Sequence, residues 1–246
     1  VHFDPATTPF ASVSAPATGA VVYLLLVFAL SRSIAKPVDV KTVETFHNGF
    51  LILLSASMCL GALSAILGRV SQEGLVDGFL CGQRAPAQIW DGPAGYWTYV
   101  YYLSKYYELF DTVILCLRKK ELTLLHLWHH TSMLFVTWSW LAHPWLEGSL
   151  WCTFVNSLIH VGMYTYFMKV TLGKKVWWKK YLTSGQIVQF WSGMAIVGIF
   201  FVYHYLVEGK NCTGNPLTGF ASTAVNASFL VLFNQFYKKS YKSKGK

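Results

Sequence analysis

The sequence predicts an all-α polytopic membrane protein, and three observations carry that prediction. Hydrophobic residues make up 54% of the chain and charged residues only 13%, which is far more apolar than a soluble domain. Apolar windows of roughly 17 to 25 residues, the length that crosses a bilayer as a helix, recur along the chain. The loops between them alternate between many and few basic residues. We therefore expect seven transmembrane helices.

One domain accounts for the whole chain. Placing the apolar windows in order leaves no soluble block over, so residues 1–246 form a single seven-span domain that ends in a cytosolic basic tail, 238–246. The expected spans are about 18–36, 46–68, 96–117, 123–143, 148–168, 181–205 and 217–237.

The basic residues sort onto the two sides of this arrangement. Only Arg69, Arg84 and Lys210 lie in loops on one side, and Lys105 lies within a span. Short loops rich in Lys and Arg stay in the cytosol, so we expect a cytosolic C-terminus and a lumenal or outside N-terminus. This distribution argues against nucleic acid as the reason for the net charge of +9. The sixteen residues expected on the cytosolic side are Arg32, Lys36, Lys41, Arg118, Lys119, Lys120, Lys169, Lys174, Lys175, Lys179, Lys180, Lys238, Lys239, Lys242, Lys244 and Lys246.

Two cysteines lie in the loops expected outside the cytosol. Cys81 and Cys212 are there in an oxidising compartment. They either form a disulfide or stay as two unpaired loop thiols. Asn211 opens a glycosylation sequon in the second of these loops.

Polar side chains lie inside four expected spans, where they are costly and by default mark a functional site. Positions three and four apart share a helix face, so these residues form one stripe in each span. A histidine stripe suits metal ligation, general acid–base catalysis or nucleophilic attack. The stripes are Lys105, Glu108, Asp111 and Thr112; His126, His129 and His130; Asn156 and His160, followed by Met163, Tyr164 and Tyr166; and Thr183, Gln186 and Gln189.

The depth of the stripes predicts that they meet. Counted from the nearest cytosolic basic residue at 1.5 Å per residue, Asp111, His129, His160 and Gln186 lie roughly 9 to 14 Å deep. The helices are therefore expected to enclose a polar active-site chamber that opens to the cytosol, with apolar helix beyond it.

Some polar residues keep a structural interpretation. Lys105 and Glu108 are also spaced as a buried ion pair that locks helix contacts, and Gln186 and Gln189 also suit hydrogen bonds between helices. The remaining histidines are expected near the membrane edges in structural or interfacial positions: His2, His47, His143 and His204.

The four stripes resemble, in order, the motifs of the ELO family of very-long-chain fatty acid elongases. Four ordered motifs are far more specific than HxxHH alone. The first histidine resembles members that act on saturated and monounsaturated chains. The matches are 105–112 to KxxExxDT, 126–130 to HxxHH, 156–167 to NxxxHxxMYxYY with Phe167 in place of the last Tyr, and 183–189 to TxxQxxQ.

This resemblance implies a 3-oxoacyl-CoA synthase that condenses a long-chain acyl-CoA with malonyl-CoA and releases carbon dioxide and CoA. No cysteine lies within the matched motifs, so the expected nucleophile is an imidazole, His129 first and His160 next, which forms an acyl-imidazole. The other expected catalytic residues orient the histidines or stabilise an enolate: Glu108, Asp111, His126, His130 and Asn156.

The remaining motif residues are assigned to substrate binding. Cytosolic lysines are expected to attract the CoA phosphates, and the apolar interior beyond the chamber is expected to form an acyl tunnel. No bound cofactor or metal is expected. The substrate-binding residues are Lys105, Thr112, Met163, Tyr164, Tyr166, Thr183, Gln186 and Gln189, the last of them also a candidate for stabilising the enolate.

Three other functions compete with this interpretation. A membrane di-iron desaturase or hydroxylase also carries HxxHH but needs more histidine ligands than the four placed suitably here. A transporter would explain intramembrane charges, although neither inverted repeats nor broken helices are evident. A non-enzymatic lipid-binding or scaffold protein would tolerate loss of His129.

The expected location is the endoplasmic reticulum membrane. Lys242, Lys244 and Lys246 resemble a dilysine retrieval signal, and a basic tail attracted to anionic lipid is the alternative. The resemblance implies a 3-oxoacyl-CoA reductase and a dehydratase as partners in an elongation cycle. The oligomeric state, including a homodimer, and the preferred acyl chain stay open.

Overall fold

The structure is a computed structural model that describes residues 4, 7–82, 92–143, 146–207, 209 and 212–242. Within these ranges the regular elements are all helical, and no strand occurs. The helices are α1 (Ser14–Ser33), α2 (Lys41–Leu75), the π-helix η1 (Val76–Leu80), α3 (Pro93–Glu108), α4 (Phe110–Leu117), α5 (Leu124–Ala142), α6 (Leu146–Thr171), α7 (Lys179–Leu206), α8 (Pro216–Tyr237) and the π-helix η3 (Lys238–Lys242).

The chain is a multi-pass membrane protein. Four helical stretches of the described residues are long and apolar enough to cross a membrane: Ser14–Ser33, Lys41–Leu80, Lys179–Leu206 and Pro216–Tyr241. Helices also occupy the other expected spans, with α3 and α4 together covering 96–117. These helices carry the ionisable residues, and α3 and α4 are individually short at 16 and 8 residues.

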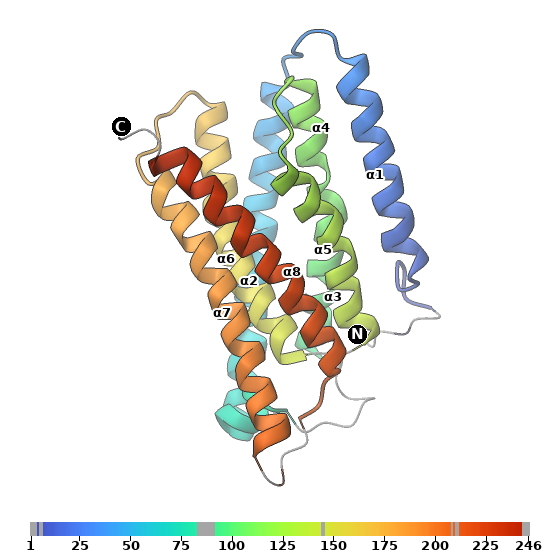
Figure 1. The fold of residues 1–246 in the computed structure, drawn as a ribbon, viewed down its shortest axis with the longest axis vertical. Coiled ribbons are helices and arrows are strands. Elements are labelled where there is room, and N and C mark those ends of the chain that lie inside the picture. Colours follow the sequence, from blue (N-terminus) through green and yellow to red (C-terminus); the bar gives the residue numbers. More distant parts are fainter. Residues whose placement is uncertain are drawn as a thin grey trace.

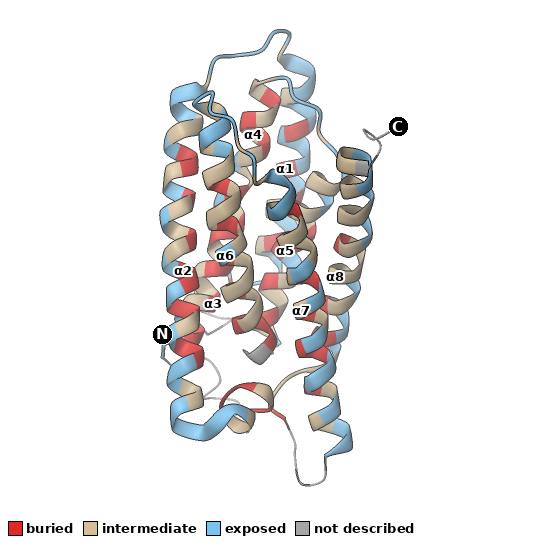
Figure 2. Ribbon diagram, turned by 90° about the vertical axis from the view of Figure 1, so that its left-hand side faces the viewer, coloured by how far each residue is buried: buried red, intermediate tan, exposed pale blue. Residues whose placement is uncertain are grey.

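Six helices form a closed ring in which each contacts the next. α2 contacts α3 and α6, α6 contacts α7, α7 contacts α8, α8 contacts α5, and α5 contacts α3. α1 lies outside this ring against α4 and α5, and Figure 1 shows it as a separate column beside the bundle. Figure 2 shows buried residues concentrated on the inward faces of the helices. The ring brings helices distant in sequence, such as α2 and α6, side by side.

A tightened turn at Leu109 separates α3 from α4. The Leu109 N–H donates to the Tyr106 carbonyl at 3.3 Å, and the Thr112 N–H donates to the Leu109 carbonyl at 3.1 Å. These i to i+3 bonds overwind the helix locally without leaving the right-handed helical region, since Leu109 has φ −59° and ψ −22°. The turn lies between the two carboxylates Glu108 and Asp111.

Side-chain caps fix where α5 and α8 begin. The Thr123 side chain accepts a hydrogen bond from the His126 N–H at 3.2 Å, so α5 starts just before the histidine run. Asn215 does the same for the Leu217 N–H at 2.9 Å, with Pro216 at the first helical position. Local sequence therefore determines the register of the histidine helix.

A disulfide links the two loops that carry Cys81 and Cys212. Their Cα atoms are 4.6 Å apart, and the bond spans 131 positions of sequence. The Thr213 N–H also donates to the Gly82 carbonyl at 2.6 Å beside it. The end of η1 is thereby tied to the start of α8 across the end of the bundle.

Gly61 gives a direct test of the contact between α2 and α3. A Cβ at Gly61 would overlap the Trp97 indole, whereas nothing lies within 4 Å of a Cβ at Gly68 on the same helix. We expect Gly61→Ala to lose about 1 to 3 kcal/mol through overpacking and Gly68→Ala to keep or raise stability through its better helix propensity. Thermal unfolding of both variants in detergent measures this, and equal melting temperatures would contradict the close approach.

Candidate functional site

The stripes converge on one cavity of about 430 Å³, here called the polar cavity. Its volume is in the range of small-molecule binding sites. It is lined from α2 through α8, and Lys179 lies on its wall. The residues expected from sequence that line it are Glu108, Asp111, His126, His129, His130, Asn156, His160, Met163, Tyr164, Tyr166, Thr183, Gln186 and Gln189.

Lys105 and Thr112, both expected to bind substrate, line neither this cavity nor the narrow one described below. They hydrogen-bond instead to side chains that do. Lys105 Nζ lies 2.7 Å from Glu108 Oε1, and both side chains are only 2% exposed. Thr112 Oγ1 lies 2.7 Å from His126 Nε2 and 2.9 Å from the Tyr23 hydroxyl. Their places in the structure are those of residues that position the cavity wall.

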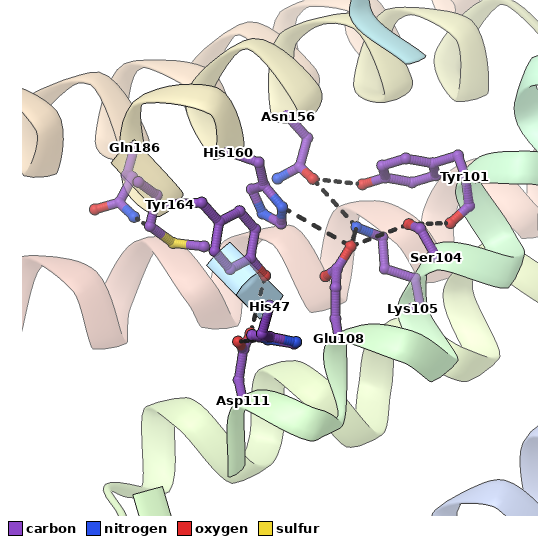
Figure 3. A network of polar contacts seen from close by, with 11 residues as sticks. His47, Tyr101, Ser104, Lys105, Glu108, Asp111, Asn156, His160, Tyr164 and Gln186 are labelled. Carbon is purple, nitrogen blue, oxygen red and sulfur yellow. Dashed lines mark hydrogen bonds and ion pairs between the residues drawn. The ribbon is translucent and has the colours of Figure 1, made fainter. Parts of the chain in front are cut away.

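The buried Lys105–Glu108 ion pair is held on several sides (Figure 3). Glu108 Oε1 also accepts a hydrogen bond from Ser104 Oγ at 3.0 Å. The ammonium group lies 4.0 Å from the centre of the Tyr101 ring, a cation–π contact. His160 Nδ1 on α6 lies 3.8 Å from the same Glu108 oxygen, too long for a hydrogen bond but within range of an ion pair.

Asn156 connects α3 and α6 and has a defined orientation. Its Oδ1 accepts from the Tyr101 hydroxyl at 2.8 Å and from Lys105 Nζ at 3.4 Å. Because an ammonium group only donates, the carbonyl oxygen must face Lys105. The Nδ2 amide is then free to donate a hydrogen bond into the cavities. Asn156 lines both the polar cavity and the narrow cavity described below. Sequence reasoning missed Tyr101, although it lies one helical turn before Lys105.

The three histidines of α5 form one continuous group of rings. The centroids of His126 and His130 are 4.4 Å apart and those of His129 and His130 are 5.4 Å apart. His130 is only 7% exposed, and on α6 His160 packs edge-on against Tyr164. The site therefore concentrates four imidazoles, of which His130 and His160 are buried and His126 and His129 are partly exposed.

His47 was expected at a membrane edge, and that expectation is wrong. Its side chain is buried, lines the polar cavity and lies with Nε2 2.8 Å from Asp111 Oδ1. The other Asp111 oxygen accepts from the Tyr164 hydroxyl at 2.9 Å. His47 comes six residues after Lys41, a depth of about 9 Å and the same count as Gln186 after Lys180. That depth count is the sequence signal that places His47 with the other stripes.

The other lone histidines lie elsewhere. His143 and His204 line neither cavity, and the His204 ring stacks on Phe200. His2 lies outside the described residues.

A second, narrow cavity of about 70 Å³ continues from the polar one. The two share His129, Asn156, Gln189 and Phe190. Away from the shared residues, the residue numbers of the lining rise along α5 and α7 and fall along α6 and α8. The narrow cavity therefore extends along the bundle toward the C-terminal ends of α5 and α7. This lining is largely apolar: Met133, Val136, Trp140, Trp151, Val155, Val197, Val225 and Phe229 are among its members.

Two tryptophans stand at the far end of the narrow cavity, each held by a serine of another helix. The Trp140 indole N–H donates to Ser222 Oγ at 2.8 Å, and the Trp151 N–H donates to Ser192 Oγ at 3.1 Å. Trp140 also stacks on Tyr101 with ring centroids 6.1 Å apart. These bonds hold bulky rings in fixed places, so the depth of the cavity is defined.

The two glutamines of α7 differ in their contacts. Gln186 Nε2 lies 3.9 Å from Met163 Sδ on α6, which is a contact between helices. Gln189 Oε1 is buried with no hydrogen-bond partner among the described residues. A buried acceptor without a partner is unusual in proteins, and here it belongs to a side chain that lines both cavities. Among the described residues, no group of three or more His, Cys, Asp or Glu side chains could hold a metal ion.

Comparison with known proteins gives matches along nearly the whole chain. The family model described as "ELO: GNS1/SUR4 family" matches residues 8–246. "Fatty acid elongase sre1" of Dictyostelium discoideum is 42% identical over 244 residues, 98% of this chain and 89% of the relative. "Very long chain fatty acid elongase 7" of Rattus norvegicus is 32% identical over 223 residues, 84% of this chain and 72% of the relative.

The ion pair predicts a stability test by paired substitution. Lys105→Met leaves Glu108 as a buried charge without its main partner, so we expect a loss of about 3 to 5 kcal/mol. The double variant Lys105→Met/Glu108→Gln removes both charges and should recover most of that loss. Thermal unfolding in detergent measures the three proteins. A double variant no more stable than Lys105→Met would show that the two charges do not stabilise each other.

Proposed function

The chain belongs to the ELO family described as GNS1/SUR4 and is a fatty acid elongase, and from this premise we propose that it catalyses the condensing step of elongation. As a 3-oxoacyl-CoA synthase, it joins a long-chain acyl-CoA to malonyl-CoA and releases carbon dioxide and CoA. Both substrates arrive as CoA thioesters, and no bound cofactor takes part. The acyl chain grows by two carbons in each cycle.

The observation that carries this proposal is that His129 lines both cavities, the only described histidine to do so. A long-chain thioester has an apolar chain and a reactive polar head. The narrow apolar cavity suits the first carbons of the chain next to the thioester, and the polar cavity suits the thioester and the CoA arm. The thioester carbonyl of a substrate held in this way lies where the two cavities join, beside the His129 ring.

In the first half of the reaction, a neutral His129 nitrogen attacks the thioester carbonyl. The carbon–sulfur bond breaks and its electron pair moves onto sulfur, which takes up a proton so that CoA leaves as a thiol. The acyl group stays on the imidazole, which gives up its own N–H proton and becomes a neutral acyl-imidazole. His160 lies across the polar cavity on α6 and is the alternative nucleophile. It is less suited because it lines only the polar cavity and faces Glu108.

In the second half, malonyl-CoA loses carbon dioxide and the electron pair of the broken bond forms an enolate. Its carbon attacks the acyl-imidazole carbonyl, the imidazole leaves and takes up a proton to become neutral His129 again, and the 3-oxoacyl-CoA product forms. The enolate oxygen needs fixed donors in a site from which water is excluded. Asn156 Nδ2 suits this role because Tyr101 and Lys105 already occupy its carbonyl oxygen; His126, His130 and Gln189 are the further candidates.

The membrane setting belongs to the same proposal. We infer seven spans in the endoplasmic reticulum membrane. The C-terminus is placed in the cytosol, because the lysine-rich loops after α1, α4 and α6 lie at the same end of the bundle as the end of α8 (Figure 1). Lys179, on the wall of the polar cavity, is then placed to meet the CoA phosphates. The 3-oxoacyl product requires a reductase and then a dehydratase to continue a cycle, so these are the expected partners.

An acyl-enzyme test separates the nucleophile candidates. Purified protein incubated with long-chain acyl-CoA and no malonyl-CoA should gain the mass of one acyl group, and hydroxylamine should remove it. His129→Ala should lack the adduct and His160→Ala should keep it, by intact-mass spectrometry. Product formation that needs both substrates together, with no adduct on the wild type, would contradict the covalent route.

The narrow cavity predicts a change in chain length. Replacing Trp140 by Ala opens its far end, so we expect products longer by at least one two-carbon step, measured by mass spectrometry of products from a mixture of acyl-CoA lengths. Trp138→Ala is the matched control: its indole N–H donates to the Ala11 carbonyl at 2.7 Å, and it lines neither cavity. An unchanged product distribution in Trp140→Ala would contradict the assignment of the narrow cavity to the acyl chain.

A further inference from the structure

Asp111 has both carboxylate oxygens engaged by side chains from two other helices. His47 Nε2 on α2 lies 2.8 Å from Oδ1, and the Tyr164 hydroxyl on α6 donates to Oδ2 at 2.9 Å. Figure 3 shows both side chains beside Asp111, apart from the Lys105–Glu108 pair. Asp111 therefore has a fixed orientation on the wall of the polar cavity.

The His47 ring is fixed as firmly as its partner. It stacks on Tyr107 with centroids 5.3 Å apart and meets Tyr164 edge-on at 6.4 Å. The groups that face it are Asp111 from α4, Tyr107 from α3 and Tyr164 from α6. On its own helix, Glu44 is engaged by Arg118 at 2.6 Å. Only Asp111 among these offers a carboxylate oxygen to the ring.

This pair differs from the other histidine–carboxylate pair of the described residues. His160 lies 3.8 Å from Glu108, whose charge Lys105 neutralises. His47 is at hydrogen-bond distance from Asp111, and no lysine or arginine of the described residues pairs with that carboxylate. An aspartate held against one nitrogen of a histidine stabilises the imidazolium and leaves the other nitrogen to exchange a proton. In His47 that other nitrogen is Nδ1, and no hydrogen-bond partner for it occurs among the described residues.

The sulfur of the departing CoA needs a proton. Condensation consumes one proton per turnover, because the malonyl carboxylate leaves as neutral carbon dioxide while CoA leaves as a thiol. When imidazole adds to a thioester, the imidazole is expelled again more easily than an alkyl thiolate. Protonation of the sulfur as its bond to carbon breaks therefore favours the forward direction.

We propose that His47, oriented by Asp111, is the general acid that protonates the sulfur of the departing CoA. The imidazolium gives its Nδ1 proton to sulfur as the carbon–sulfur electron pair moves onto sulfur. The neutral ring keeps its Nε2–H on Asp111 and is recharged by the proton that His129 releases when it becomes a neutral acyl-imidazole. This assignment rests on the proposed function and adds a catalytic residue on α2, on the wall that carries none of the motif histidines.

The test compares two leaving groups in His47→Gln, whose amide still donates to Asp111 but cannot carry a proton. The substrates are an acyl-CoA and the same acyl group as a thioester of an acidic aromatic thiol, which leaves without a proton. We expect His47→Gln to slow thiol release from acyl-CoA by about 100-fold or more and release from the aromatic thioester by far less. Rates relative to the wild type with each substrate remove differences in binding.

The matched control is Tyr164→Phe, which removes the other hydrogen bond to Asp111 and leaves His47 in place. It should slow both thioesters by the same factor, as expected for a residue that only positions. Equal slowing of both thioesters in His47→Gln would overturn the assignment and leave His47 as a positioning residue. The rates of thiol release are measured with and without malonyl-CoA, because the thiol of the acyl thioester leaves in the first half of the reaction in either case. Thiol release by the wild type only when malonyl-CoA is present would contradict the acyl-imidazole route alone, so the two failures are distinguishable.

Discussion

The burial of Lys105 against Glu108 is the interaction on which the arrangement of the site depends. An unpaired charge inside an apolar bundle costs several kcal/mol, so this pair must stay together in any folded state. Lys105 also reaches Asn156 of α6, and Glu108 faces His160 of the same helix. The pair itself lies within α3, and its contacts with Asn156 and His160 fix how α3 is rotated relative to α6.

The ring of six helices turns this local constraint into two connected compartments. Polar stripes gather toward the end of the bundle that carries most of the lysines, and apolar side chains line the space beyond them. A boundary between polar and apolar lining falls at His129 and Asn156, which belong to both. A substrate with an apolar chain and a polar thioester would place its chain in the apolar cavity and its head in the polar cavity. The thioester carbon would then lie at the boundary, because the two cavities differ in polarity and not because of any single contact.

Much of this could be predicted from the sequence, and the failures have physical reasons. Apolar windows predicted where the helices lie, and depth counting predicted that the stripes would gather at one level. The turn at Leu109 was not predictable because its backbone stays helical. His47 was assigned to a membrane edge because it is not part of a stripe of polar residues on its helix. Tyr101 was missed because its contact with Asn156 depends on how α3 is rotated against α6. The ring order was also inaccessible, since hydropathy does not encode which helices are neighbours.

The two carboxylates of the site, Glu108 and Asp111, lie three residues apart and have different partners. Glu108 is neutralised by an ammonium group and supported by Ser104, so its charge serves mainly to hold the bundle together. Asp111, 15% exposed in its side chain, is held by a phenol and an imidazole and keeps an unneutralised charge beside the cavity. A carboxylate of the second kind can stabilise an imidazolium on a neighbouring ring before that ring gives up its proton. Glu108 and Asp111 lie on either side of the turn at Leu109, so one short segment carries a carboxylate paired with an ammonium group and a carboxylate held by a phenol and an imidazole.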